Sequence, residues 1–279
     1  MPIVTASDGT KINYYLDDFT DPWKESETIV IAHGCGESSR MTYRLMPGLL
    51  AGNYKVLRID ERGHGESGIP PGGYKPSLER FADDVLNVMD HLGFSKVHFF
   101  GNHSGGWVGM VLSVAHPDRV KSLILCSTPD KLSSKVAKES APAGKDDMPT
   151  AIRKLGWREY LRQVQIGASM TDPAITPEIR EWYDNERGKN DTEVQAIRHE
   201  FAYSSPGQGD LLTQIKVPTL IITGANCHLC APEMAVAMQK RIPKAQLAVL
   251  ENGYSAVYFM QADQCVRAVL NFHRALGWG

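Results

Sequence analysis

Short runs of apolar, often β-branched residues recur along the chain, separated by polar or glycine-containing segments. The runs cover residues 28–32, 54–59, 96–100, 120–125, 219–223 and 246–250. Runs this short with so few polar positions are typical of strands buried on both faces of a parallel sheet. Residues 2–6 and 12–17 flank the turn signal Asp8-Gly9, which predicts an opening β-hairpin. The pattern therefore predicts an eight-stranded sheet.

Segments with helical spacing fill the gaps between these runs. Residues 78–92 carry apolar side chains at the spacing of one helix face, whereas residues 107–115 are apolar on every side. Residues 257–276 form a third helical segment at the end of the chain. Strands that alternate with helices favour an α/β fold, in which a mostly parallel sheet is flanked by helices.

The alternation of strand and helix is interrupted in the middle of the chain. Only helical patterns are visible there, at residues 148–166, 177–187 and 191–203. We expect a core formed by residues 1–130 and 213–279, and a helical cap formed by residues 131–212 between strands six and seven. A cap in this place would cover the strand ends and close a ligand pocket beneath it.

Composition narrows the classes of partner. The 279 residues carry a formal net charge of -2, which gives no electrostatic reason to expect nucleic acid or an anionic membrane as a partner. No stretch approaches the ~20 apolar residues of a membrane span, and the first residues lack the pattern of a signal peptide. We expect a cytoplasmic protein that acts on a small molecule, and the sequence leaves a homodimer open.

The five cysteines are scattered along the chain, and an odd, scattered set is typical of reduced thiols in a cytosolic protein. Cys227 and Cys230 form a C-x-x-C pair with His228 between them. Such a pair is half of a zinc site, but no second pair follows. We therefore predict two loop thiols and no metal. Because no phosphate-binding loop is present, we also predict no organic cofactor.

Four motifs follow one another in a fixed order. His33-Gly34 comes after the third strand, and residues 60–67 read Asp-Glu-Arg-Gly-His-Gly-Glu-Ser. Gly101-Asn-His-Ser-Gly-Gly106 lies between a strand and a helix, and His116-Pro117 precedes the sixth strand. In this order the motifs resemble the oxyanion loop, the D-x-R-G-x-G-x-S segment and the nucleophile elbow of the α/β-hydrolase superfamily. The resemblance covers nearly the whole chain outside the cap and implies the α/β-hydrolase fold.

The elbow motif has a histidine where most members of that superfamily have a nucleophile. Reading G-x-apex-x-G gives Gly101, His103 and Gly105. His103 also stands fourteen residues before Pro117, which is the usual spacing in the family. A register shifted by one residue would put Ser104 at the apex and would lose the first glycine. We therefore expect His103 at the apex.

The other two positions of the triad also depart from the family. The resemblance puts Cys227 where the acid usually lies and Ser255 where the histidine usually lies. The Ser-His-Asp mechanism needs a hydroxyl at the apex, a base beside it and an acid that orients the base, so we do not transfer that mechanism. Asp130 is a weaker candidate for the acid. The resemblance still implies an oxyanion hole formed by the backbone N–H groups of Cys35 and Ser104.

Three interpretations of His103 remain open. In the first, it is a general base whose ring is hydrogen-bonded by Ser255, and it serves proton abstraction, elimination, isomerisation or water activation. In the second, it is a nucleophile, or it activates water on an ester or lactone. In the third, the chain is a catalytically silent or engineered member that binds a small ligand.

We expect an enzyme that acts on a small apolar ester, lactone or enolisable ketone. Its catalytic positions would be His103, Ser255 and Cys227. The residues expected to line the substrate pocket are Gly34, Trp157, Tyr254 and His228.

Overall fold

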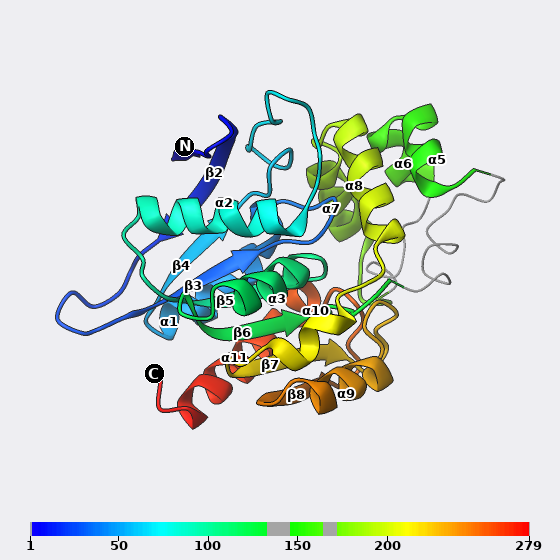
Figure 1. The fold of residues 1–279 in the computed structure, drawn as a ribbon. Coiled ribbons are helices and arrows are strands. Elements are labelled where there is room, and N and C mark those ends of the chain that lie inside the picture. The colour runs from blue at the N-terminus through cyan, green and yellow to red at the C-terminus, as the bar shows by residue number, and fades with distance from the viewer. Residues whose placement is uncertain (1, 133–145, 164–171, 279) are drawn as a thin grey trace.

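The computed structural model describes residues 2–132, 146–163 and 172–278. An eight-stranded sheet runs through it in the order β1-β2-β4-β3-β5-β6-β7-β8 (Figure 1). The strands are β1 (Ile3–Thr5), β2 (Lys11–Asp17), β3 (Glu27–Ala32), β4 (Tyr54–Ile59), β5 (Val97–Asn102), β6 (Val120–Cys126), β7 (Thr219–Gly224) and β8 (Ala245–Leu250). β2 pairs antiparallel with both β1 and β4, and the remaining pairs are parallel. The predicted, mostly parallel eight-stranded sheet is confirmed.

Helical elements cover both faces of this sheet and lie beyond the ends of its parallel strands. They are η1 (Ser39–Leu45), α1 (Met46–Ala51), α2 (Leu78–His91), α3 (Gly105–Ala115), α5 (Met148–Leu155), α6 (Trp157–Gln163), α7 (Pro177–Arg187), α8 (Thr192–Ser204), η2 (Gly209–Gln214), α9 (Pro232–Arg241), α10 (Val257–Met260) and α11 (Ala262–Ala275). In β3, Val30 belongs to a hydrophobic cluster with α2 and α3, whereas Ile29 and Ile31 belong to a second cluster with α1 and α11. Successive strand residues point to opposite faces, so a sheet covered on both faces reads as a continuous apolar run.

Two segments expected to be single helices are each divided in two. The segment at 148–166 breaks between α5 and α6 at Gly156, whose φ of 79° lies in the left-handed region that glycine adopts without strain. Residues 164–166 of that prediction lie outside the described residues. The segment at 257–276 breaks at Gln261, which has φ -126° and ψ 40°, between α10 and α11.

Between β6 and β7, the described part of the chain forms helical elements and no strand. Helices α5 to α8 lie on the side toward which the arrowheads of the parallel strands point (Figure 1). Ile152, Trp157 and Tyr160 belong to a hydrophobic cluster of their own in these helices. Of the expected cap, residues 133–145 and 164–171 lie outside the described residues.

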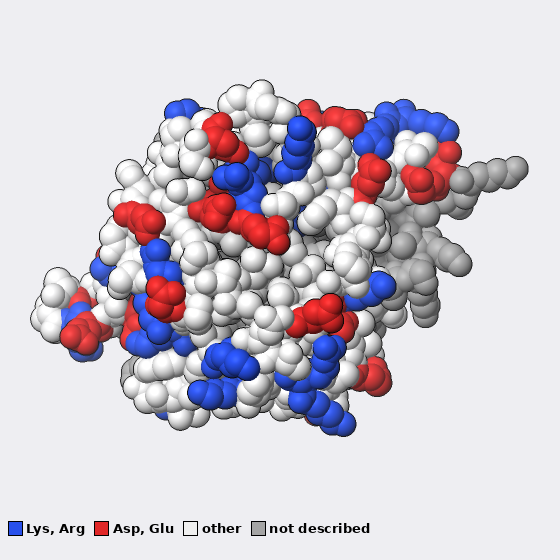
Figure 2. All heavy atoms as spheres, viewed as in Figure 1, with Lys and Arg blue, Asp and Glu red and all other residues white. Residues whose placement is uncertain are grey.

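Charge is evenly mixed on the face of the molecule drawn in Figure 2, where acidic and basic side chains are interspersed. This distribution agrees with the formal net charge of -2. Among the described helices, none combines the length and apolar character needed to cross a membrane.

Candidate active site

A sharp turn joins the end of β5 to the start of α3, and His103 lies at its apex. The φ of His103 is 49°, a left-handed conformation that L-residues rarely adopt. Ser104, the next residue, has helical angles (φ -69°) and precedes α3. The turn needs glycine because a Cβ on Gly101 would lie 2.4 Å from the Cα of Gly106. The structure thus places His103, and not Ser104, at the apex.

An oxygen atom lies near each ring nitrogen of His103, and Nδ1 also lies 3.5 Å from Nδ2 of Asn102. Nε2 lies 2.9 Å from the main-chain carbonyl oxygen of Ser255. Nδ1 lies 3.6 Å from Oε1 of Glu37, at ion-pair distance. A carboxylate on one side of the ring and a carbonyl oxygen on the other fix the orientation of the imidazole.

Glu37 is a buried carboxylate surrounded by donors, with a relative exposure of 3%. Its oxygens accept hydrogen bonds from the Gly34 N–H (2.9 Å), Asn102 Nδ2 (2.9 Å), the Tyr183 hydroxyl (2.7 Å) and the Tyr258 hydroxyl (2.8 Å). Burial acts to raise the pKa of Glu37, but His103 and the two tyrosine hydroxyls outweigh it and hold the pKa well below the usual range. Glu37 therefore provides a fixed negative charge beside the apex.

Of the two backbone N–H groups expected to form an oxyanion hole, one already has a hydrogen-bond acceptor. The Cys35 N–H donates to the hydroxyl oxygen of Ser104 at 2.8 Å. The same oxygen accepts from Nη2 of Arg198 at 3.1 Å. No described residue accepts a hydrogen bond from the Ser104 N–H. One of the two donors is thus open and the other is covered by a side chain that can rotate.

Ser255 belongs to the loop after β8, and its hydroxyl lies against the loop after β7 and not against the ring of His103. Cys227 Sγ is 3.3 Å from it, and the N–H groups of His228 and Leu229 donate to it at 3.2 and 3.4 Å. Two backbone donors in a short loop need an acceptor, and Ser255 supplies it. Only the carbonyl group of Ser255 contacts His103, and Cys227 contacts Ser255 through its thiol.

The expected pocket residues have different surroundings. A Cβ on Gly34 would lie 3.0 Å from the Cβ of His103, so Gly34 borders the apex directly. Trp157 is buried, and its indole N–H donates to the Arg187 carbonyl oxygen at 2.8 Å. Tyr254 is half-buried and His228 is exposed. Among the described residues, no group of three or more His, Cys, Asp or Glu side chains could hold a metal ion.

A thiol–imidazole contact lies beside the oxyanion loop. Cys35 Sγ is 3.6 Å from both ring nitrogens of His199. Burial raises the pKa of the Cys35 thiol to about 12 and lowers the pKa of His199 to about 3. Both groups are therefore neutral, and Cys35 is a poor nucleophile in this environment.

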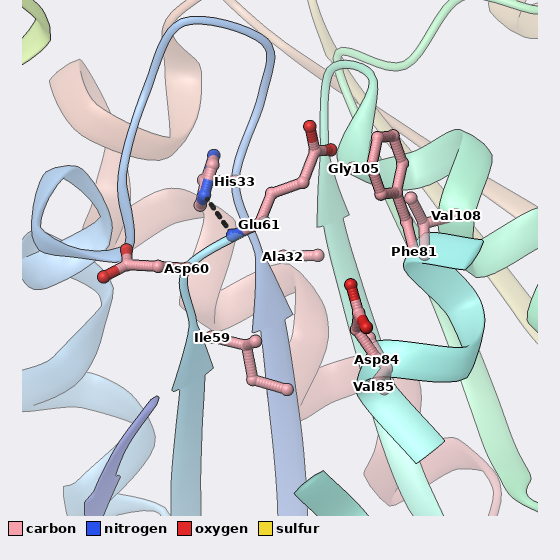
Figure 3. Close-up of a pocket in the computed structure, with 10 residues that line it drawn as sticks. All are labelled: Ala32, His33, Ile59, Asp60, Glu61, Phe81, Asp84, Val85, Gly105 and Val108. Atoms are coloured by element: carbon pink, nitrogen blue, oxygen red, sulfur yellow. Dashed lines mark hydrogen bonds between the residues drawn. The ribbon is translucent and has the colours of Figure 1, made fainter. Parts of the chain in front are cut away.

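A small cavity of about 30 Å³ lies behind the elbow, between α2, α3 and the ends of β3 and β4 (Figure 3). Its lining includes the carboxylates of Glu61 and Asp84 and the ring of His33, which accepts from the Glu61 N–H at 2.9 Å. This space holds about one water molecule and no organic substrate.

Sequence reasoning missed the groups that surround His103 most closely. Glu37 stands three residues after Gly34, in a loop that the resemblance already places beside the elbow. An acidic residue in an otherwise uncharged loop was the available signal. Tyr183 and Arg198 come from α7 and α8, and nothing in the sequence indicated which of their side chains would reach the elbow.

Comparison with known proteins places these features in a family. The family model described as "Serine aminopeptidase, S33" matches residues 24–258. A putative carbamate hydrolase RutD of Caulobacter segnis is 36% identical over 101 residues, which are 36% of this chain and 37% of that protein. A proline iminopeptidase of Lactobacillus acidophilus is 24% identical over 276 residues, with 87% of this chain and 88% of that protein covered.

A solved structure agrees with this assignment at the level of the fold. The enol-lactonase from Burkholderia xenovorans LB400 matches with a TM-score of 0.83 at 24% identity, with 97% of this chain and 99% of that chain covered. The chain therefore shares the fold of that protein over nearly its whole length. The chain therefore belongs to the α/β-hydrolase superfamily of enzymes, in the family described as serine aminopeptidase, S33.

Proposed function

We propose that the chain is an enzyme that hydrolyses a small organic ester or lactone, or enolises a small ketone, by proton transfer at His103. One observation carries the proposal: Nδ1 of His103 lies 3.6 Å from Oε1 of Glu37, a buried carboxylate whose pKa is held below its usual range. In a Ser-His-Asp triad the carboxylate orients the imidazole and stabilises the imidazolium. Glu37 is the positioning residue of the same kind here.

The contacts of the ring place Nε2 of His103 for proton transfer to or from an oxygen atom. Nε2 already lies 2.9 Å from a carbonyl oxygen, which is the separation that proton transfer requires. A substrate oxygen that replaces the Ser255 carbonyl at Nε2 would receive the proton. Catalytic hydrogen bonds often form only in the complex with substrate, so the contact with Ser255 is a resting arrangement.

For an ester or lactone, direct hydrolysis by water needs no covalent enzyme intermediate. Water adds to the carbonyl carbon while Nε2 of His103 takes its proton, and the carbonyl oxygen takes the negative charge. The carbonyl then re-forms, the bond to the alcohol oxygen breaks, and that oxygen leaves with the proton from His103. The Ser104 N–H stabilises the carbonyl oxygen, and the Cys35 N–H joins it once the Ser104 hydroxyl rotates away. Acyl-bond cleavage is supported by the similar proteins, which are named as a lactonase, a putative carbamate hydrolase and a peptidase.

The test is turnover by the wild-type chain and two variants in the presence of a metal chelator. The panel holds short p-nitrophenyl esters, five- and six-membered lactones, and small ketones whose deuterium exchange is followed by NMR. We expect His103→Gln to lose about 100-fold or more in turnover, and Glu37→Gln about tenfold, because the imidazole loses the carboxylate that orients it. His91→Gln changes an exposed histidine and is the control. Equal rates for wild type and His103→Gln would exclude His103 as the catalytic group.

A second candidate function is ligand binding without turnover. It is favoured by the closed resting state, in which the Ser104 hydroxyl covers the Cys35 N–H and both nitrogens of His103 are engaged. The two functions separate on consumption of the ligand. An enzyme depletes a bound lactone with time, whereas a binding protein returns it unchanged.

A further inference from the structure

Arg187 is a buried cation without a carboxylate partner among the described residues. It lies at the end of α7 with a relative exposure of 5%. Its Nε donates to the Gly36 carbonyl oxygen at 3.3 Å, and its buried Nη1 has no hydrogen-bond partner. Burial of an unpaired charge is unfavourable, so such a group needs a reason to be retained.

The other buried arginines of the described residues each contact a carboxylate, although Nη1 of Arg198 also has no hydrogen-bond partner. Arg62 donates to two carboxylates, those of Asp84 and Asp8. Arg198 forms a two-point contact with Glu61 at 2.7 and 3.1 Å. Besides the Gly36 carbonyl oxygen, Arg187 contacts the faces of two aromatic rings, Trp157 at 5.3 Å and Tyr183 at 5.8 Å. The rings attract a cation but offer no hydrogen-bond acceptor to Nη1.

Arg187 lies beside the proposed catalytic pair. The carbonyl that it contacts belongs to Gly36, the residue before Glu37. The neighbouring Tyr183 donates directly to Glu37. A Cβ on Gly36 would lie 3.2 Å from Nη2 of Arg187 and 3.3 Å from Oε1 of Gln195. The glycine therefore keeps the backbone of the oxyanion loop close to the guanidinium without a side chain between them.

No described carboxylate accepts a hydrogen bond from the guanidinium of Arg187, whose Nη1 has no partner and whose Nε has only a carbonyl oxygen. Arg198, by contrast, forms an ion pair with Glu61. A guanidinium binds a carboxylate through two parallel N–H donors. A carboxylate on the substrate would therefore give Arg187 the partner that the described residues do not supply.

We propose that Arg187 binds a carboxylate group of the substrate, so that the ester, lactone or ketone acted on at His103 belongs to a molecule that also carries one carboxylate. The proposal rests on the proposed function, whose substrate class it narrows. Arg187 is then a binding and specificity residue.

The first measurement uses binding alone, so that it stands whether or not the enzyme turns over any ester. Hexanoate and hexanamide have the same length and differ in charge, and calorimetry or NMR titration gives the dissociation constant of each. We expect the wild-type chain to bind hexanoate about tenfold more tightly than hexanamide, and Arg187→Gln to bind both alike. Arg162→Gln removes an exposed arginine from α6 and should keep the preference.

Two further arms make the result decisive. Arg187→Lys replaces Arg187→Gln if the latter fails to fold. It keeps the positive charge but loses the two parallel N–H donors, so we expect it to retain about a third of the preference for hexanoate. Hexyl phosphate should bind no more tightly than hexanoate, and tighter binding would point to phosphate esters and overturn the carboxylate. Equal affinity of the wild-type chain for hexanoate and hexanamide would also overturn the proposal. A preserved preference with no turnover of any substrate would reject the proposed function and leave the carboxylate site standing.

Discussion

The hydroxyl oxygen of Ser104 accepts a hydrogen bond from the Cys35 N–H, which is a donor that a substrate oxygen would need. It accepts from the Cys35 N–H at 2.8 Å and from Arg198 at 3.1 Å. In Ser104→Ala the Cys35 N–H is free to bind substrate, and Arg198 keeps Glu61 as its partner. We expect kcat within about threefold of wild type and a lower KM, because a ground-state competitor has been removed. Steady-state kinetics on the best ester or lactone measures both.

The same variant separates proton transfer at His103 from an ordinary serine mechanism. Removal of a serine nucleophile costs about 10⁶-fold in kcat. A loss of that order in Ser104→Ala would make Ser104 the nucleophile and reject the present mechanism. Wild-type turnover in Ser104→Ala with loss in His103→Gln would leave proton transfer by the histidine.

The sequence predicted the position of His103 but not the partners of its ring. The glycine spacing of the elbow is local, so His103 could be placed from the motif alone. Glu37 is local too and was overlooked because the acid was sought at family positions. Ser255 was expected to contact the ring through its hydroxyl, but that hydroxyl accepts from two loop N–H groups instead. The need of two loop N–H groups for an acceptor set the orientation of the Ser255 side chain. The spacing of residues in the sequence carries no information on that orientation.

Among the elements, the strand–turn–helix unit of β5 and α3 depends most strictly on glycine. A Cβ on Gly101 would lie 2.4 Å from the Cα and 2.5 Å from the N of Gly106, both backbone atoms that cannot move aside. We expect Gly101→Ala to lower the free energy of unfolding by about 3 kcal/mol, the cost of severe overpacking. Urea denaturation measures the change as a shift of the midpoint.

A matched glycine tests whether the cost comes from the clash or from the loss of glycine itself. No atom lies within 4 Å of the place where a Cβ on Gly72 would stand. Gly72→Ala should therefore change the free energy of unfolding by less than about 0.5 kcal/mol. Similar losses in both variants would mean that the packing of the elbow is not the cause.

Strands were easier to predict than helices at this scale. A strand buried on both faces, such as β4, reads as an uninterrupted apolar run, and its bounds agree with the predicted 54–59. A break in a helix leaves a weaker signal. Gly156 sits within a pattern that continues on both sides, and its φ of 79° depends on how α6 packs after the turn. Tertiary packing, which one sequence does not display, set these boundaries.

At the scale of the whole molecule, buried histidines lie at opposite ends of the sheet. His64 and His199 lie near α8, where Gln195 contacts both. His98 and His273 stack at 4.0 Å near the other strand ends and share the hydroxyl of Ser122. Burial lowers the pKa to about 4 for His64 and His273, about 3 for His199 and about 2 for His98.

These four histidines make the fold sensitive to acid. Each is neutral in the folded chain down to its lowered pKa, whereas in the unfolded chain it binds a proton below about 6.5. Unfolding therefore takes up protons between pH 6.5 and about 4, and stability rises with pH across that window. Each such histidine contributes up to about 1.4 kcal/mol per pH unit. We expect the urea midpoint to be nearly constant above pH 7 and to fall steeply below pH 6.5.

A single variant tests how much of the change of stability with pH comes from His273, at one end of the sheet. His273→Gln removes one titrating ring, while the amide can still bond the hydroxyls of Tyr54 and Ser122, which now hold the ring at 2.7 and 2.9 Å. Its urea midpoint should fall less steeply with pH than that of wild type, whereas the exposed His91→Gln should follow wild type. Parallel curves for all three chains would show that the acid sensitivity arises from other groups. A shallower curve for His273→Gln alone would tie the pH range of stability to a buried network far from His103, so that activity and stability would have separate pH dependences.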